Sequence, residues 1–169
     1  MQTEKERFSV STKTGDDGYT NIIGRDRLPK NHPILESLGT LDELNAFLGD
    51  AKAALNTQSD TTEIINEIQK DLSLLMGILA GMSIPAEGID EGRLTSLIDE
   101  LEATLPPFTA FAVPGANPVS AKLHIARTIC RRAERRLVGS GLSEKVMAIV
   151  VPYINRLSDL LFLLARKES

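Results

Sequence analysis

The sequence predicts an all-α protein, a five-helix bundle preceded by an ordered N-terminal loop segment. Three observations support this prediction. Apolar residues recur at spacings of three and four over most of the chain after residue 32, which is typical of helices with one buried face. Proline and glycine residues break this pattern into five stretches. The chain has no tryptophan and only 4 % aromatic residues, so its core must consist mainly of leucine, isoleucine, valine and alanine.

The first 32 residues differ from the rest of the chain. They contain Gly15, Gly18 and Gly24 among clustered threonine, aspartate and asparagine residues, and they lack a helical apolar period. This composition predicts an ordered loop or short strands. With 169 residues, the chain has the length of one ordinary domain. We therefore expect a single domain over 1–169, whose helices occupy 33–169.

Capping residues and helix breakers delimit the first three helices. The first is expected over about 34–55, where apolar residues recur every three or four positions. The second begins after the capping residues Asp60 and Thr61. The third is expected over about 90–105 and stops at a Pro-Pro pair.

The last two helices are expected over about 119–138 and from residue 143 to 166. Gly139 and Gly141 end the first of them, and Ser143 can cap the second. Pro152 lies inside the last helix, where it removes one backbone donor and predicts a kink. Five helices with short connections are typical of a bundle.

Composition excludes several classes of protein. The 19 basic and 23 acidic residues give a net charge of −4, which argues against a nucleic-acid partner. The single cysteine, Cys130, rules out an intrachain disulfide and a cysteine-rich zinc site. The N-terminus lacks an apolar run of signal-peptide length, so we expect a cytoplasmic protein with no membrane association.

The helix expected over 119–138 is the most informative element. Its apolar stripe has small members that would let a neighbouring helix approach closely: Leu123, Ala126, Cys130, Ala133 and Leu137. Polar residues share the sector beside this stripe: His124, Arg127, Arg131, Glu134 and Arg135. Arg132 and Arg136 lie further from the apolar stripe around the helix. Arginine suits bidentate phosphate binding, which favours an anion site. A solvated face with surface ion pairs is the alternative, and the helix alone leaves both open.

A second candidate anion site lies in the segment STKTGDDGYTN. Its glycines can turn consecutive backbone N–H groups to one side as a nest for an anion. Hydroxyl, amide and lysine side chains stand beside them: Thr12, Lys13, Thr14, Thr20 and Asn21. The glycine spacing of a Walker A loop is missing. Taken alone, the segment fits an ordinary turn better than an anion site.

Two further clusters carry carboxylates. Asp42 opens the run DELN in the first helix, and Asn155 lies four residues before Asp159 on a shared face of the last helix. Buried polar groups must be paired, so we expect the arginines of the helix over 119–138 to be their partners. A structural network is the expected role of Asp159 and Arg156, and a ligand contact that of Asn155.

Four sequence blocks together resemble a known family. They are TKTGDDGYT near the start, GTLDELNAFLG in the first helix, LHIARTICRRAERRLV in the fourth and YINRLSDLLFLLAR at the end. In this order they resemble the PduO-type ATP:corrinoid adenosyltransferases, and they span most of the chain. The pairing of RRAER with NRLSD is the most specific part of the resemblance.

The resemblance implies a homotrimer of five-helix bundles with active sites at the subunit interfaces. Such enzymes transfer the 5′-deoxyadenosyl group of ATP to cob(I)alamin and form adenosylcobalamin and triphosphate, with Mg²⁺ as the ion. Cobalamin is thus the second substrate. A flavin-dependent reductase or a cobalamin-dependent enzyme that accepts the product would be the partner.

Positions that match the family motifs imply the site residues, with 1–32 as a nucleotide-binding segment. Asp42 and Arg127 would form an intersubunit salt bridge on the corrinoid side. Phe111 matches the aromatic residue that displaces the lower axial ligand of cobalamin. The implied ATP-binding residues are Thr12, Lys13, Thr14, Gly15, Thr20, Asn21, Lys30, Arg131, Arg132, Glu134, Arg135 and Asn155.

Two departures from the family pattern lie near the corrinoid side. The family usually has Pro-Gly-Gly after the aromatic loop, where this chain has Pro114, Gly115 and Ala116, and HPILESLG replaces a charged run before the first helix. The changes around Phe111 and Gly115 are the ground for an alternative function, a catalytically silent ATP-binding regulatory bundle. A purely structural helical oligomer, in which the arginines pair across subunits, is a third hypothesis.

Overall fold

The computed structural model describes residues 11, 13–23, 26–83, 85, 88–107 and 113–169. Five helices dominate it, as the sequence predicts. They are α1 (Pro33–Ala53), α2 (Asp60–Leu79), α3 (Glu91–Thr104), α4 (Pro118–Val138) and α5 (Glu144–Lys167). Two short strands, β1 (Tyr19–Thr20) and β2 (Leu28–Pro29), precede them and pair antiparallel.

Side-chain caps fix where the helices begin. The His32 Nδ1 atom accepts from the Ile34 N–H at the start of α1. The α2 cap is Ser59, one residue before the predicted pair, because its hydroxyl accepts from the Thr61 N–H over 3.2 Å. Asn117 caps α4 through the Ser120 N–H. Ser143 occupies the N-cap position of α5, but its side chain makes no capping hydrogen bond.

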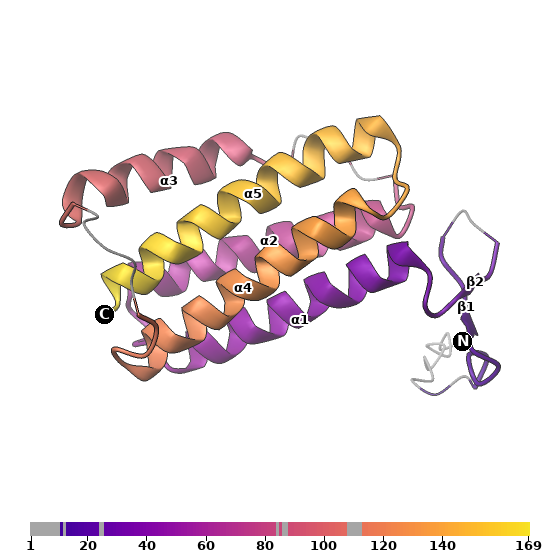
Figure 1. Ribbon diagram of the computed structural model, residues 1–169, viewed down its shortest axis with the longest axis horizontal. Coiled ribbons are helices and arrows are strands. Elements are labelled where there is room, and N and C mark those ends of the chain that lie inside the picture. The colour runs from indigo at the N-terminus through magenta and orange to yellow at the C-terminus, as the bar shows by residue number, and fades with distance from the viewer. Residues whose placement is uncertain (1–10, 12, 24–25, 84, 86–87, 108–112) are drawn as a thin grey trace, which may run out of the picture.

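The helices pack around one leucine-rich core. Helix α4 lies against both α1 and α5, α2 packs against α1 and α5, and α3 lies on the outer side of α5 (Figure 1). The predicted apolar stripe of α4 is buried in full, with Leu123, Ala126, Cys130, Ala133 and Leu137 each 0 % exposed. Burial raises the pKa of the Cys130 thiol, so this residue is a small core side chain rather than a nucleophile.

Helix α5 is the central core helix. By length and composition it could cross a membrane, yet ten of its residues are buried against the other helices. Its apolar character therefore follows from its place in the bundle. Pro152 lies within the continuous helical span, on the exposed side.

The N-terminal segment projects beyond the start of α1 (Figure 1), and it contacts the bundle near Gly81. Ile22 is only 8 % exposed. The neighbouring Ile23 carbonyl oxygen approaches Gly81, after α2, so closely that a Cβ at residue 81 would lie 2.2 Å from it. Gly81 also has a φ of +87°, which favours glycine. This close approach fixes the segment next to the α2–α3 connection.

Candidate functional site

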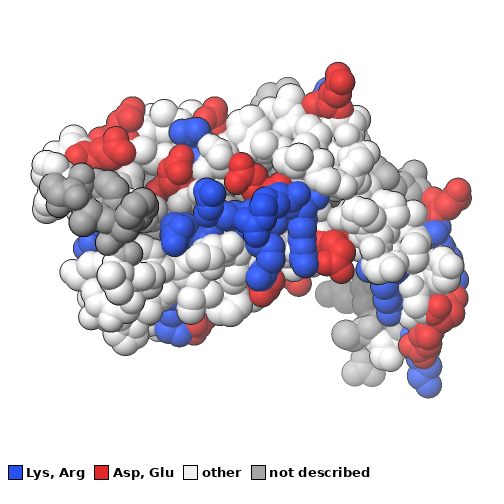
Figure 2. All heavy atoms as spheres, viewed as in Figure 1, with Lys and Arg blue, Asp and Glu red and all other residues white. Residues whose placement is uncertain are grey.

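The arginines of α4 divide into two groups. Arg132 forms an ion pair with Glu43 of α1, and Arg136 pairs with Glu36 of α1 over 3.1 Å. Arg127 and Arg131 instead line a cleft on the side of α5. Basic side chains gather along the middle of the face over α4 and α5 (Figure 2). The surface ion pairs that the sequence left open are thus present in one sector of α4, and the anion site stays a prediction for the sector that faces the cleft.

The cleft lies between α3, α4 and α5 and has a volume of about 530 Å³. Its arginines come from two helices, Arg127 and Arg131 from α4 and Arg156 and Arg166 from α5. Phe162 of α5 and acidic residues of α3 complete much of the wall. A cleft with both apolar and cationic surface can hold a large ligand that carries anionic groups.

Two polar side chains join α4 to α5 beside this cleft. Asn155 Nδ2 donates to Glu134 Oε1 over 3.0 Å. Arg156 Nη2 donates to Asn155 Oδ1 over 2.8 Å. The blocks RRAER and NRLSD thus meet in space. The expected partners are corrected, because Asn155 binds Glu134 rather than an arginine of α4, and Asp159 pairs with Arg156 of its own helix.

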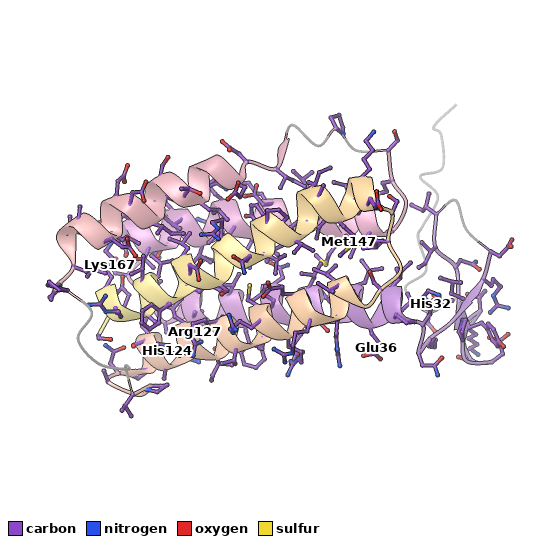
Figure 3. All side chains as sticks on the ribbon, turned by 45° about the horizontal axis from the view of Figure 1, so that its top comes forward. His32, Glu36, His124, Arg127, Met147 and Lys167 are labelled. Carbon is purple, nitrogen blue, oxygen red and sulfur yellow. The ribbon has the colours of Figure 1, made fainter. Side chains whose placement is uncertain are left out.

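His124 and Arg127 form a second polar pair, one helical turn apart on α4 (Figure 3). Arg127 Nε donates to His124 Nδ1 over 3.4 Å, and His124 is only 4 % exposed. Burial, and then the Arg127 charge, lower the pKa of His124 below its usual value of 6.5. The imidazole is therefore neutral at pH 7 and can accept the hydrogen bond from Arg127.

The N-terminal segment brings Gly15 and Lys30 together. A Cβ at residue 15 would lie 3.1 Å from Lys30 Nζ, so the glycine leaves room for the ammonium group. Lys13 has a φ of 57°, which turns the chain just before the glycine. Arg27 donates to Asp17 and to the Thr14 carbonyl, and its hydrogen bonds lower the pKa of Asp17. The segment is thus an ordered turn clamped by one arginine.

Other predicted site residues are not brought together within one chain. Thr20 lies in β1 and Asn21 is exposed after it, at the bundle end that the N-terminal segment occupies (Figure 1). Among the described residues, no hydrogen bond or ion pair links Lys30 to α4.

Asp42 is exposed on α1, and in the described part of the chain it forms no ion pair with Arg127. Arg135 donates to the Arg131 carbonyl over 3.0 Å. Thr12 and Phe111 lie outside the described residues.

Sequence reasoning missed one buried polar cluster. The Tyr153 hydroxyl of α5 donates to Asp71 Oδ2 of α2 over 2.6 Å, and Arg93 of α3 pairs with the same carboxylate. Burial and the Asp71 carboxylate raise the pKa of Tyr153. Asp71 interrupts the apolar stripe of α2. This interruption is the sequence feature that could have indicated a buried polar contact. The cluster ties α3 to the bundle and so positions one wall of the cleft.

Comparison with known proteins gives a consistent assignment. The model of the family described as cobalamin adenosyltransferase matches residues 10–168. Corrinoid adenosyltransferase of Bacillus subtilis is 41 % identical over 94 % of this chain and 86 % of its own. The chain therefore belongs to the cobalamin adenosyltransferase family, whose members are typically oligomeric.

A second relative and a solved structure are also similar to this chain. Corrinoid adenosyltransferase PduO of Salmonella typhimurium is 38 % identical over 96 % of this chain, which spans only 50 % of the length of that relative. A variant PduO-type ATP:corrinoid adenosyltransferase from Lactobacillus reuteri, solved in complex with cobalamin and ATP, superposes with a TM-score of 0.83. It is 34 % identical, and the match covers 95 % of this chain and 93 % of that one.

Proposed function

We propose that this chain transfers the 5′-deoxyadenosyl group of ATP to cob(I)alamin and releases triphosphate. The observation that carries the proposal is the hydrogen bond between Glu134 and Asn155. It joins the two most specific sequence motifs at the edge of a cleft that Arg131 lines. The division of the chain into a nucleotide-binding segment, 1–32, and a helical part, 33–169, belongs to the same proposal.

The residues of the site suit the nucleotide half of the reaction. In this proposal Arg131 binds the triphosphate, with Arg135, Arg132, Glu134 and Asn155 around it. Charge-assisted donors stabilise the negative charge that grows on the leaving group. The other side of the nucleotide is proposed for the N-terminal residues Lys13, Thr14, Gly15, Thr20, Asn21 and Lys30, and Thr12, next to Lys13 in sequence, belongs to the same proposal.

The corrinoid half of the reaction is proposed for the cleft between α3, α4 and α5. Arg166, which lines the cleft, donates to the Pro106 carbonyl over 2.5 Å. This bond holds Pro106, which precedes the segment containing Phe111 in sequence, next to a residue that lines the cleft. Phe111 would then displace the lower axial ligand and exclude water from that face of cobalt.

The chemistry requires positioning more than activation. The electron pair of the Co(I) centre attacks C5′ of ATP, the Co–C bond forms, and the C5′–O bond breaks with its electron pair on triphosphate. Since the substrate is itself the nucleophile, the residues around the cleft hold C5′ in line with cobalt and stabilise the departing anion.

Mg²⁺ is proposed as an ion carried by the triphosphate. Mg²⁺ in nucleotide sites is usually held by substrate phosphates, waters and one or two carboxylates. Within the described ranges no group of three histidine, cysteine or acidic side chains could form a protein cage for a metal. The residues therefore fit an ion bound mainly by ATP, with Glu134 as the nearby carboxylate.

A homotrimer with active sites between subunits is part of the proposal. The N-terminal segment projects beyond the start of α1 (Figure 1), and among the described residues no hydrogen bond or ion pair links its Lys30 to α4, so a neighbouring subunit would bring the two parts of the site together. Asp42 and Arg127 would pair across the same interface. We also propose a cytoplasmic location, with a flavin-dependent reductase supplying the electron or a cobalamin-dependent enzyme accepting the product.

Anaerobic turnover tests this function. Purified protein is mixed with ATP, Mg²⁺ and chemically reduced cob(I)alamin, and the visible spectrum is followed for adenosylcobalamin. The regulatory alternative predicts that ATP raises the melting temperature without turnover, because a ligand that binds only the folded state stabilises it. A purely structural oligomer predicts neither effect.

A further inference from the structure

We infer that Arg156 is a positioning residue that fixes the orientation of the Asn155 side-chain amide in the ATP site. The inference rests on the proposed function, because it assigns a role within that site. Arg156 belongs to α5 and lies next to Asn155 in sequence, where its guanidinium group reaches three different partners.

The three contacts point in different directions. Arg156 Nη2 donates to Asn155 Oδ1 over 2.8 Å. Nη1 lies 3.4 Å from Asp159 Oδ2, one turn further along α5. Nε lies 3.6 Å from Glu91 Oε1, in the first turn of α3. Two carboxylates therefore hold the guanidinium plane while one edge of it holds the amide.

This arrangement selects one orientation of the Asn155 amide. A carboxamide has an acceptor end and a donor end. With Oδ1 bound to Arg156, Nδ2 faces Glu134 Oε1 at 3.0 Å. The flipped amide would place its N–H groups against the guanidinium donors and its oxygen against the Glu134 carboxylate. Both contacts would be repulsive, so Arg156 and Glu134 together lock the amide.

Arg156 differs from the arginine proposed to bind phosphate, Arg131, in the number of carboxylates around its guanidinium group. Arg156 has two carboxylates, Glu91 and Asp159, within 4 Å of its nitrogens. Its positive charge is thus largely compensated before any ligand arrives. Arg131 lines the same cleft without such an ion pair among the described residues. The geometry therefore favours an indirect role for Arg156, exerted through Asn155.

A double-mutant cycle on ATP affinity tests the inference. The dissociation constant for ATP is measured by calorimetry for wild type, Arg156→Ala, Asn155→Ala and the double variant. We expect Arg156→Ala to weaken ATP binding about tenfold in the wild-type background, which is about 1.4 kcal/mol. In the Asn155→Ala background the same change should cost less than about twofold, because coupled neighbours are not additive. Equal factors in both backgrounds would overturn the inference.

Two control variants and one substitute variant make the test specific. Arg156→Lys retains the charge but lacks the planar fork, so it should recover only part of the affinity. Lys70→Ala, on the exposed face of α2, removes a surface ion pair with Glu67 outside the lining of the cleft and should leave ATP affinity unchanged. Should Arg156→Ala fail to fold, Glu91→Gln removes one anchor of the guanidinium and should weaken ATP binding about twofold to threefold.

The outcomes also separate this inference from the proposed function. Wild-type protein that binds no ATP would overturn both. Wild-type protein that binds ATP, with Arg156→Ala and Glu91→Gln binding it equally well, would overturn the positioning role alone. Loss of melting temperature in Arg156→Ala with unchanged ATP affinity would show that the residue is only structural.

Discussion

Asn155 on α5 donates a 3.0 Å hydrogen bond from its side-chain amide to the carboxylate of Glu134 on α4. The two residues are far apart in sequence, and their contact crosses the most extensive helix–helix interface of the bundle. It lies beside the cleft that Arg127 and Arg131 line. The packing of the small α4 residues against α5 therefore determines the geometry of the candidate ATP site.

Arg131→Ala should weaken ATP binding by about 10-fold to 100-fold, because hydrogen bonds to charged groups contribute roughly 1.5–3 kcal/mol. Calorimetry with ATP and Mg²⁺ measures this change. Arg136→Ala is the matched control on the same helix. Arg136 pairs with Glu36 and Thr40 of α1, so its loss should lower the melting temperature and spare ATP affinity. Unchanged ATP binding in Arg131→Ala would remove the phosphate site from α4.

Phe111→Ala should spare ATP affinity and slow the transfer to cobalamin. The proposed role of Phe111 concerns the lower face of cobalt, which ATP does not touch. Calorimetry gives the ATP affinity, and single-turnover spectroscopy gives the transfer rate. Equal losses in both measurements would contradict this role.

The stability of the protein should fall as the pH drops below about 6.5. His124 has a lowered pKa in the folded state because it is buried, whereas in the unfolded chain it titrates near 6.5. Below pH 6.5 the unfolded state therefore binds more protons than the folded state, and the free energy of unfolding decreases. Above about pH 7 this contribution is constant.

Melting curves between pH 5 and 8 (a range that brackets the titration of histidine) measure this effect. His124→Gln keeps a hydrogen-bond acceptor for Arg127 and cannot become charged. The difference in melting temperature between wild type and His124→Gln should therefore change with pH only below about 6.5. A constant difference across the range would show that His124 does not titrate as proposed.

Gly81→Ala should destabilise the docking of the N-terminal segment. The added Cβ would lie 2.2 Å from the Ile23 carbonyl oxygen, on a residue with a φ of +87°. We expect a loss of about 1–3 kcal/mol in the free energy of unfolding and weaker ATP binding. Gly39→Ala is the control, since a Cβ there meets nothing within 4 Å in a helix and should stabilise the protein by about 0.5–1 kcal/mol. Equal melting temperatures for the two variants would contradict this account.

The fold follows closely from the sequence because the features that determine it, apolar periodicity and helix-breaking residues, are local in the chain. Helical periodicity and breakers predict all five helices, and the stated ends differ from the observed ones by at most two residues. The small residues of α4 likewise predict the burial of its apolar stripe. The N-cap of α2 falls one residue early because serine, aspartate and threonine occur in succession and each can cap a helix.

The site was less predictable because its contacts are between helices. A helical projection places Arg131 and Arg132 at different angles, but it does not say which sector faces α1. Only packing assigns Arg132 to Glu43 and Arg131 to the cleft. The Tyr153–Asp71 hydrogen bond joins residues 82 positions apart, so no local pattern could pair them.

The most direct test of the central claim measures both products of one anaerobic reaction. Protein, ATP, Mg²⁺ and cob(I)alamin are mixed, adenosylcobalamin is determined from the visible spectrum, and triphosphate is determined in the same sample. The proposed transfer predicts equal amounts of the two products, formed only when protein and ATP are both present. ATP binding without adenosylcobalamin or triphosphate would contradict it and identify the chain as a nucleotide-binding regulatory bundle.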